Sequence, residues 1–85
     1  MNKGILYFSA PWCGPCKAMS PLVEQMEKKG QIKVKKVNID YDATLSQKYS
    51  VKSIPTMILT DLQGNEIKRN VGGMSEQQIL DFYNG

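Results

Sequence analysis

Two cysteines stand close together, at Cys13 and Cys16, and they are the only cysteines among the 85 residues of the chain. A pair at this spacing can close into a disulfide and open again, because one thiolate attacks a disulfide and the second thiol then resolves the mixed disulfide. The thiolate is the reactive form, and Cys-X-X-Cys pairs lower the pKa of a cysteine to roughly 3.5 to 7.5. The spacing therefore predicts a site for thiol–disulfide exchange.

The sequence around the cysteines predicts that they lie where a strand is followed by a helix. Residues 5–8 form a short apolar run typical of a buried strand. Beyond the cysteines, apolar residues recur at the spacing of one helical face, at Met19, Leu22, Val23 and Met26. The free backbone N–H groups at a helix N-terminus favour negative charge. We therefore expect Cys13 to attack as a thiolate and Cys16, nearly one turn into the helix, to resolve.

The remaining segments predict an α/β fold that holds this junction in place. A strand over residues 32–40 follows the first helix after a return that suits a right-handed βαβ crossover. Asp42 is expected to cap a short helix, and Ser75 and Gln78 make a capping box at the start of the last helix. The predicted order is βαβαββα, with the later elements at residues 56–60 (strand), 62–65 (turn), 66–71 (strand) and 75–83 (helix).

Composition and charge indicate one small globular domain over residues 1–85. The chain is 41% hydrophobic and 22% charged, and its length leaves room for a single modest core. The net charge of +3 is too small to indicate a nucleic-acid partner. No apolar leader precedes the first strand, and no run approaches the roughly 18 apolar residues of a membrane span. We therefore expect a cytoplasmic protein without membrane contact, in which a transient catalytic disulfide is expected and a structural one is not.

The chain contains no histidine, and this excludes several kinds of site. A Cys–His catalytic pair and a zinc site with histidine ligands both need a residue that is missing here. A closed zinc site takes four ligands, whereas this chain offers two thiols, so a metal would have to bridge two chains. We expect neither a metal nor a bound cofactor.

The segment Trp12-Cys13-Gly14-Pro15-Cys16-Lys17 resembles the active-site signature of thioredoxins. The resemblance extends from residue 4 to the end of the chain. Residues 49–56 resemble the segment that carries the cis-proline of the family, which falls at Ile54-Pro55, and Val71-Gly72 resembles the glycine at the far rim of the site. Full-length thioredoxins carry a further strand and helix in front of the matching part. The resemblance thus implies a minimal thioredoxin fold, a four-stranded mixed sheet flanked by three helices.

The resemblance also implies a surface that binds the substrate around the cysteines. A proline without an N–H leaves the backbone of the residue before it available to pair with an extended substrate, as Ile54 would be here. An exposed Trp12 and the Val71-Gly72 segment complete an apolar platform. The residues expected to bind substrate are Trp12, Gly14, Pro15, Ile54, Pro55, Val71 and Gly72.

The function that the resemblance implies is protein-disulfide reduction by a monomer that cycles between dithiol and disulfide. Such a protein takes part in electron transport and cell redox homeostasis, reduces disulfide-containing target proteins, and is regenerated by a separate reductase, here expected to be of the thioredoxin-reductase type. Gly14-Pro15 resembles the reducing branch of the fold. Two alternatives stay open. Gly72-Gly73 faintly resembles the glutathione-binding corner of glutaredoxins, and some thioredoxins act as binding modules without redox chemistry.

Three departures from the family pattern bear on the mechanism and the sheet edge. Tyr7 stands where thioredoxins commonly hold a buried aspartate behind the second cysteine, and Lys36, which matches the partner of that aspartate, lacks the anion. We therefore expect Cys16 to resolve mixed disulfides more slowly than in a typical thioredoxin. Ser9 replaces an aromatic residue. The second strand lacks its outer neighbour, and lysines on it are expected to protect that edge, at Lys33, Lys35 and Lys36.

Overall fold

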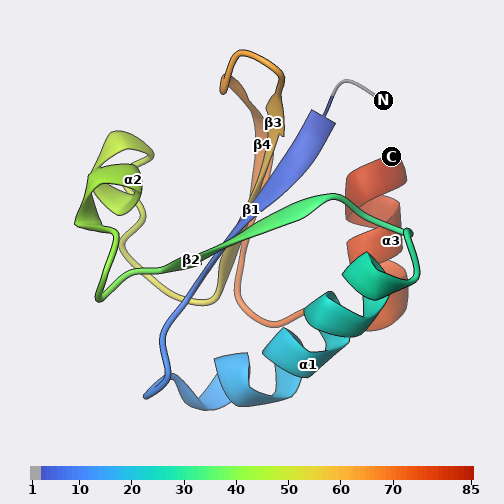
Figure 1. Ribbon diagram of the computed structural model, residues 1–85, viewed down its shortest axis with the longest axis horizontal. Helices are drawn as coiled ribbons and strands as arrows, with labels where there is room; N and C mark the ends of the chain where they lie inside the picture. The colour runs from blue at the N-terminus through green and yellow to red at the C-terminus, as the bar shows by residue number, and fades with distance from the viewer. Residues whose placement is uncertain (1–2) are drawn as a thin grey trace.

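The computed structural model describes residues 3–85 and contains, over this range, four strands and three helices in the predicted order βαβαββα (Figure 1). The first two residues of the predicted domain lie outside the described residues. The elements are β1 (Lys3–Ser9), α1 (Gly14–Lys28), β2 (Val34–Asn38), α2 (Ala43–Lys48), β3 (Thr56–Asp61), β4 (Glu66–Val71) and α3 (Glu76–Asn84).

The strands form one mixed sheet in the order β2-β1-β3-β4. β1 runs parallel to β2, with Ile5 opposite Val34, and the crossover between them is α1. β3 is antiparallel to both of its neighbours, β1 and β4. The predicted four-stranded mixed sheet with three helices is therefore confirmed, and β2 is an edge strand, as the resemblance implied.

The helices cover the two faces of the sheet unequally (Figure 1). Successive residues of a strand point to opposite faces. Ile5 and Tyr7 belong to a large core that includes α1 and α3, whereas Phe8 belongs to a smaller one beside α2. The predicted apolar face of α1 enters the large core, where Met19, Val23 and Met26 are buried.

Helix ends follow the expected capping chemistry. The Asp42 side chain accepts the backbone N–H of Leu45 at 3.2 Å and begins α2. Ser75 accepts the N–H of Gln78, and the Gln78 side chain accepts the N–H of Ser75 in return, which confirms the capping box. The proline within the first helix, Pro21, does not end α1, which continues to Lys28.

The second strand is shorter than predicted. Sequence pattern indicates residues 32–40, whereas β2 covers Val34–Asn38. The strand ends because the Asn38 carbonyl accepts the N–H groups of both Tyr41 and Asp42, which turns the chain. At the other end, Ile32 is buried in the large core before the strand begins.

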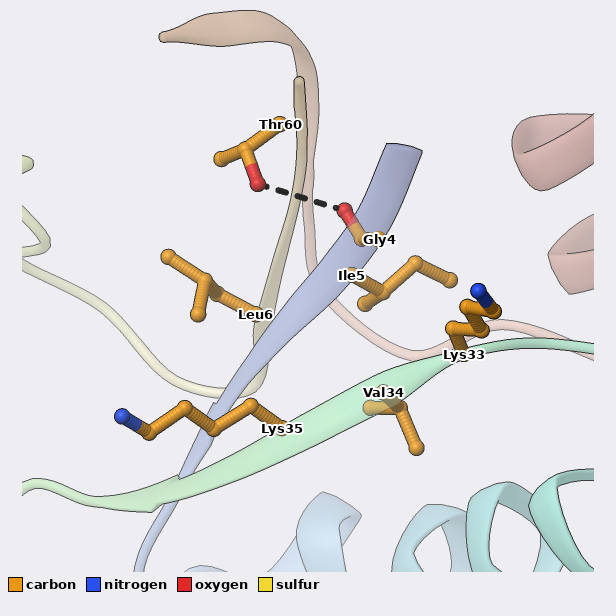
Figure 2. Close-up of a pocket in the computed structure, with 7 residues that line it drawn as sticks. All are labelled: Gly4, Ile5, Leu6, Lys33, Val34, Lys35 and Thr60. Atoms are coloured by element: carbon orange, nitrogen blue, oxygen red, sulfur yellow. Dashed lines mark hydrogen bonds between the residues drawn. The ribbon is translucent and has the colours of Figure 1, made fainter. Parts of the chain in front are cut away.

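The lysine-bearing edge lies beside a hollow of about 270 Å³ at the start of β1 (Figure 2). Lys33 and Lys35 line it together with Leu6 of β1, and the Thr60 hydroxyl donates to the Gly4 carbonyl at 3.5 Å across it. The cysteines follow the other end of β1, so this hollow is separate from them. No helix within residues 3–85 is long and apolar enough to cross a membrane.

Candidate active site

Cys13 and Cys16 form a disulfide at the start of α1, with their Cα atoms 5.2 Å apart. Cys13 is the N-cap residue, and its sulfur accepts the backbone N–H of Cys16 at 3.2 Å. The Cys13 carbonyl accepts the N–H of Lys17 at 3.3 Å, which closes the first helical turn. Pro15 lies in that turn, where a missing N–H breaks no helical hydrogen bond. The predicted strand-to-helix junction is therefore confirmed.

The two sulfurs differ by position more than by burial. Cys13 is 4% exposed and Cys16 is 2% exposed, so the two side chains are almost equally buried in the disulfide form. Cys13 precedes the helix, and its sulfur faces a free backbone N–H of the first turn, whereas Cys16 lies inside the helix. A negative charge on sulfur is thus better stabilised at Cys13.

Trp12 is exposed beside the disulfide and is held by a contact that the sequence pattern did not reveal. Its side chain is 64% exposed, and its indole N–H donates to the Asp40 carboxylate at 3.0 Å. The Asp40 N–H in turn donates to the Asn38 side chain at 2.9 Å. Asp40 follows β2 as Trp12 follows β1, and parallel neighbours end at the same edge of a sheet. That placement after a neighbouring strand is the signal that points to Asp40.

The Ile54-Pro55 peptide bond is cis, as the resemblance implied. Pro55 is buried, and its carbonyl accepts the N–H of Gly72 at 2.8 Å. Gly72 has φ of +109°, a conformation that other residues rarely adopt, which explains the glycine at this position. Ile54 makes no backbone hydrogen bond to any residue of the range 3–85.

Sheet topology brings these segments to one edge. β3 is antiparallel to β1, so Thr56 at its start lies opposite Phe8 near the end of β1. Val71, at the end of β4, lies opposite Thr56 in turn. The start of β3 and the end of β4 therefore lie at the sheet edge where β1 ends and leads to the disulfide. At this edge Val71 is 59% exposed, and Gly14 and Pro15 are exposed as well.

Tyr7 lies beneath the first helix and is fully buried. Its hydroxyl is 2.9 Å from the Ser20 hydroxyl, one turn of α1 beyond Cys16. Burial raises the pKa of Tyr7 because the anion would lose its hydration; the hydrogen bond with Ser20 lowers it in part, and the negative charge of Glu24 raises it. The lysine left without its family partner, Lys36, lies 3.7 Å from Glu24. The carboxylate that pairs with Lys36 is thus on α1, at Glu24, whereas β1 supplies none.

A metal site within the described residues would need side chains grouped as ligands. Within the range 3–85, no three side chains among Cys, Asp and Glu are arranged to hold a metal ion. The Cys13–Cys16 disulfide belongs to a class of site that exchanges thiols and disulfides.

Comparison with known proteins identifies the family. The sequence model described as Thioredoxin matches residues 1–84. The thioredoxin of Rickettsia felis is 37% identical over 79 residues, which cover 91% of this chain and 74% of that protein. The bifunctional thioredoxin reductase/thioredoxin of Mycobacterium leprae is 39% identical over 82 residues, 93% of this chain and 18% of that one. The structure of a mutant Halobacterium salinarum thioredoxin superposes with a TM-score of 0.87 at 29% identity, covering 98% of this chain and 73% of that chain.

The chain belongs to the thioredoxin family. With its Cys13–Cys16 disulfide it is a thioredoxin-like disulfide reductase, which is a thiol–disulfide oxidoreductase. The matches are to thioredoxins by sequence and by structure, which favours this function over the glutaredoxin-like alternative.

The buried Tyr7 hydroxyl predicts a loss of stability at high pH. Its pKa is higher in the folded protein than in the unfolded chain, so the unfolded state is the first to release the proton. The contribution of Tyr7 to the free energy of unfolding is therefore complete below about pH 10. As the pH rises further it falls, by up to about 1.4 kcal/mol per pH unit. Urea unfolding from pH 8 to 11 should show the advantage of the wild type over Tyr7→Phe shrinking above pH 10. The change Tyr41→Phe at an exposed tyrosine is the control. The assignment is contradicted if the difference in unfolding free energy between the wild type and each variant does not change with pH.

Proposed function

We propose that Cys13 is the attacking thiolate and that Cys16 resolves the mixed disulfide. Cys13 attacks a target disulfide, and one target sulfur leaves as a thiolate. Cys16 then attacks the Cys13 sulfur, the bond from Cys13 to the target breaks, and the reduced target departs as the Cys13–Cys16 disulfide forms. The observation that carries this assignment is the position of Cys13 at the N-cap of α1, where its sulfur accepts the Cys16 N–H.

We propose that the rim around the disulfide binds an extended stretch of the target protein. The Ile54 backbone groups lack partners among residues 3–85 and suit strand-like pairing with such a stretch. Apolar contact comes from the exposed Trp12 and Val71 side chains. The complete proposed surface is Trp12, Gly14, Pro15, Ile54, Pro55, Val71 and Gly72.

We propose that a separate reductase of the thioredoxin-reductase type regenerates the dithiol. The Mycobacterium leprae relative, whose name joins thioredoxin reductase and thioredoxin, supports this pairing. We further propose that the chain acts as a cytoplasmic monomer formed by a single domain over residues 1–85, without a bound cofactor, a nucleic-acid partner or membrane contact. The single sheet with helices on both faces supports the single domain, and the small net charge of +3 supports the lack of a nucleic-acid partner.

A reductase of this type should have a low reduction potential. Equilibration in thiol–disulfide buffers, followed by the fluorescence of Trp12, the only tryptophan, should give a two-electron transition well below the cytosolic glutathione poise of about −220 to −260 mV. A midpoint at or above that poise would favour glutathione coupling or an oxidant. The absence of a reversible transition would favour a binding module.

Single cysteine variants should separate the two sulfur roles. With an oxidised protein substrate such as insulin, Cys16→Ser should accumulate a mixed disulfide at Cys13, detectable by intact mass, whereas Cys13→Ser should form little. The double Cys→Ser variant should lose all reductase activity. If the Cys13→Ser variant traps substrate at Cys16 as fast as the Cys16→Ser variant traps it at Cys13, the assignment is contradicted.

Val71 should matter for protein substrates and not for small ones. Val71→Lys places a charge on the proposed apolar rim, and we expect KM for a protein disulfide to rise about tenfold, roughly the cost of a lost apolar contact. The rate with a small aromatic disulfide should be unchanged. Ile67→Lys is a matched control, because Ile67 is similarly exposed, at 54% against 59%, four residues earlier on β4. Equal effects of both changes would show that the rim does not bind substrate.

A further inference from the structure

A second hollow opens beside the resolving cysteine and contains a carboxylate. Its volume is about 280 Å³, and Cys16, Ser20 and Glu24 line it along α1. A water molecule occupies about 30 Å³ in the liquid, so the hollow has room for several. Ala10, Pro11, Lys17 and Pro21 complete the lining. The Cys16 side of the disulfide therefore lies at a hollow that also holds the polar side chains of Ser20 and Glu24.

Cys16, Ser20 and Glu24 form one stripe on α1, because they are spaced four residues apart. Each step of four residues advances about 6 Å along the helix, and side chains tilt back toward its N-terminus. Ser20 thus lies between Cys16 and Glu24 along this stripe, and all three line the hollow. A hydroxyl both donates and accepts hydrogen bonds, so Ser20 can carry a proton between water molecules on its two sides.

Glu24 is the carboxylate that lines this hollow, and charged and titratable groups lie near it on α1, β1 and β2. Lys36 lies 3.7 Å away on β2, Lys17 lines the same hollow, and Lys28 lies one turn further along α1, so cations surround the carboxylate. Tyr7 faces it from β1 with a neutral hydroxyl bonded to Ser20. A neutral phenol is a poor proton acceptor, and the raised pKa of Tyr7 keeps it neutral. The Glu24 side chain is about half exposed and can pass a proton on to solvent.

We propose that Glu24 accepts the proton of the Cys16 thiol, through water and the Ser20 hydroxyl, when Cys16 resolves the mixed disulfide. The proposal rests on the roles given to the two cysteines above. The Cys16 proton passes to a Glu24 oxygen, and the Cys16 thiolate attacks the Cys13 sulfur. The Cys13–Cys16 bond forms as the bond from Cys13 to the target sulfur breaks. The target leaves as a thiolate that takes a proton from water, and Glu24 returns its proton to solvent.

The test uses the reduced protein and dithiobis(nitrobenzoic acid) in a stopped-flow spectrometer. Attack by Cys13 releases one coloured nitrothiobenzoate, and resolution by Cys16 releases a second, so each step has its own phase. We compare the wild type with Glu24→Gln, with Glu24→Asp, which keeps the carboxylate, and with Glu27→Gln. Glu27 is an exposed carboxylate of the same helix that does not line the hollow, so its variant is the matched control.

We expect Glu24→Gln to slow the second phase about tenfold at pH 7. This is less than the roughly 100-fold or more that a directly bonded general base contributes, because the proton has to pass through water. The first phase should be unchanged. The deficit should vanish well above pH 8.5, the ordinary pKa of a cysteine thiol, because Cys16 then needs no acceptor. Glu24→Asp should recover part of the rate, and Glu27→Gln should match the wild type.

Either of two results overturns the proposal. One is a second phase that Glu24→Gln leaves unchanged, and the other is a deficit of constant size from pH 6 to 10, which a purely structural role would give. A first phase that is missing in the wild type would instead contradict the role of Cys13, so the two failures are distinguishable.

Discussion

The parallel hydrogen bonding of β1 to β2 is the constraint on which the position of the site depends. Parallel strands need a long crossover, and here α1 supplies it, so the helix must begin where β1 ends. The first turn of that helix places backbone N–H groups at the Cys13 sulfur. The same pairing ends β2 at this edge and brings Asp40 to Trp12. One ladder thus sets both the electrostatics of the reactive sulfur and the orientation of its neighbour.

Beneath the resolving cysteine, the buried polar group is neutral and the charged group lies nearer the surface. A buried carboxylate at position 7 would have to lose its hydration, which is costly without a close partner. Tyr7 instead buries a neutral hydroxyl whose hydrogen bond is satisfied by Ser20. The negative charge lies further out, at the half-exposed Glu24, where Lys36 is its counterion. Exposed pairs of this kind contribute little to stability, about 0 to 1 kcal/mol, so the arrangement leaves the carboxylate available for chemistry.

Sequence reasoning predicted the features that short segments encode. The start of a helix at Cys13 and the caps at Asp42 and Ser75 depend on residues within one helical turn, and the structure has all three. The cis bond before Pro55 came from family resemblance and not from local chemistry. The same reasoning missed contacts between distant segments. The bond of Trp12 to Asp40 joins residues 28 positions apart, and no local pattern specifies such a distance.

The position of the β3–β4 turn has a consequence for handling the protein. β3 begins at the sheet edge where β1 ends and leads to the disulfide. It spans six residues, so at about 3.3 Å per step its far end lies roughly 17 Å from that edge. The Asp61 carboxylate organises the turn there by accepting the N–H groups of Gln63 and Asn65 at 2.9 Å. Leu62 is exposed at its tip. A fluorophore or a surface anchor attached at Leu62 would therefore leave the disulfide facing away from its support and open to large protein substrates.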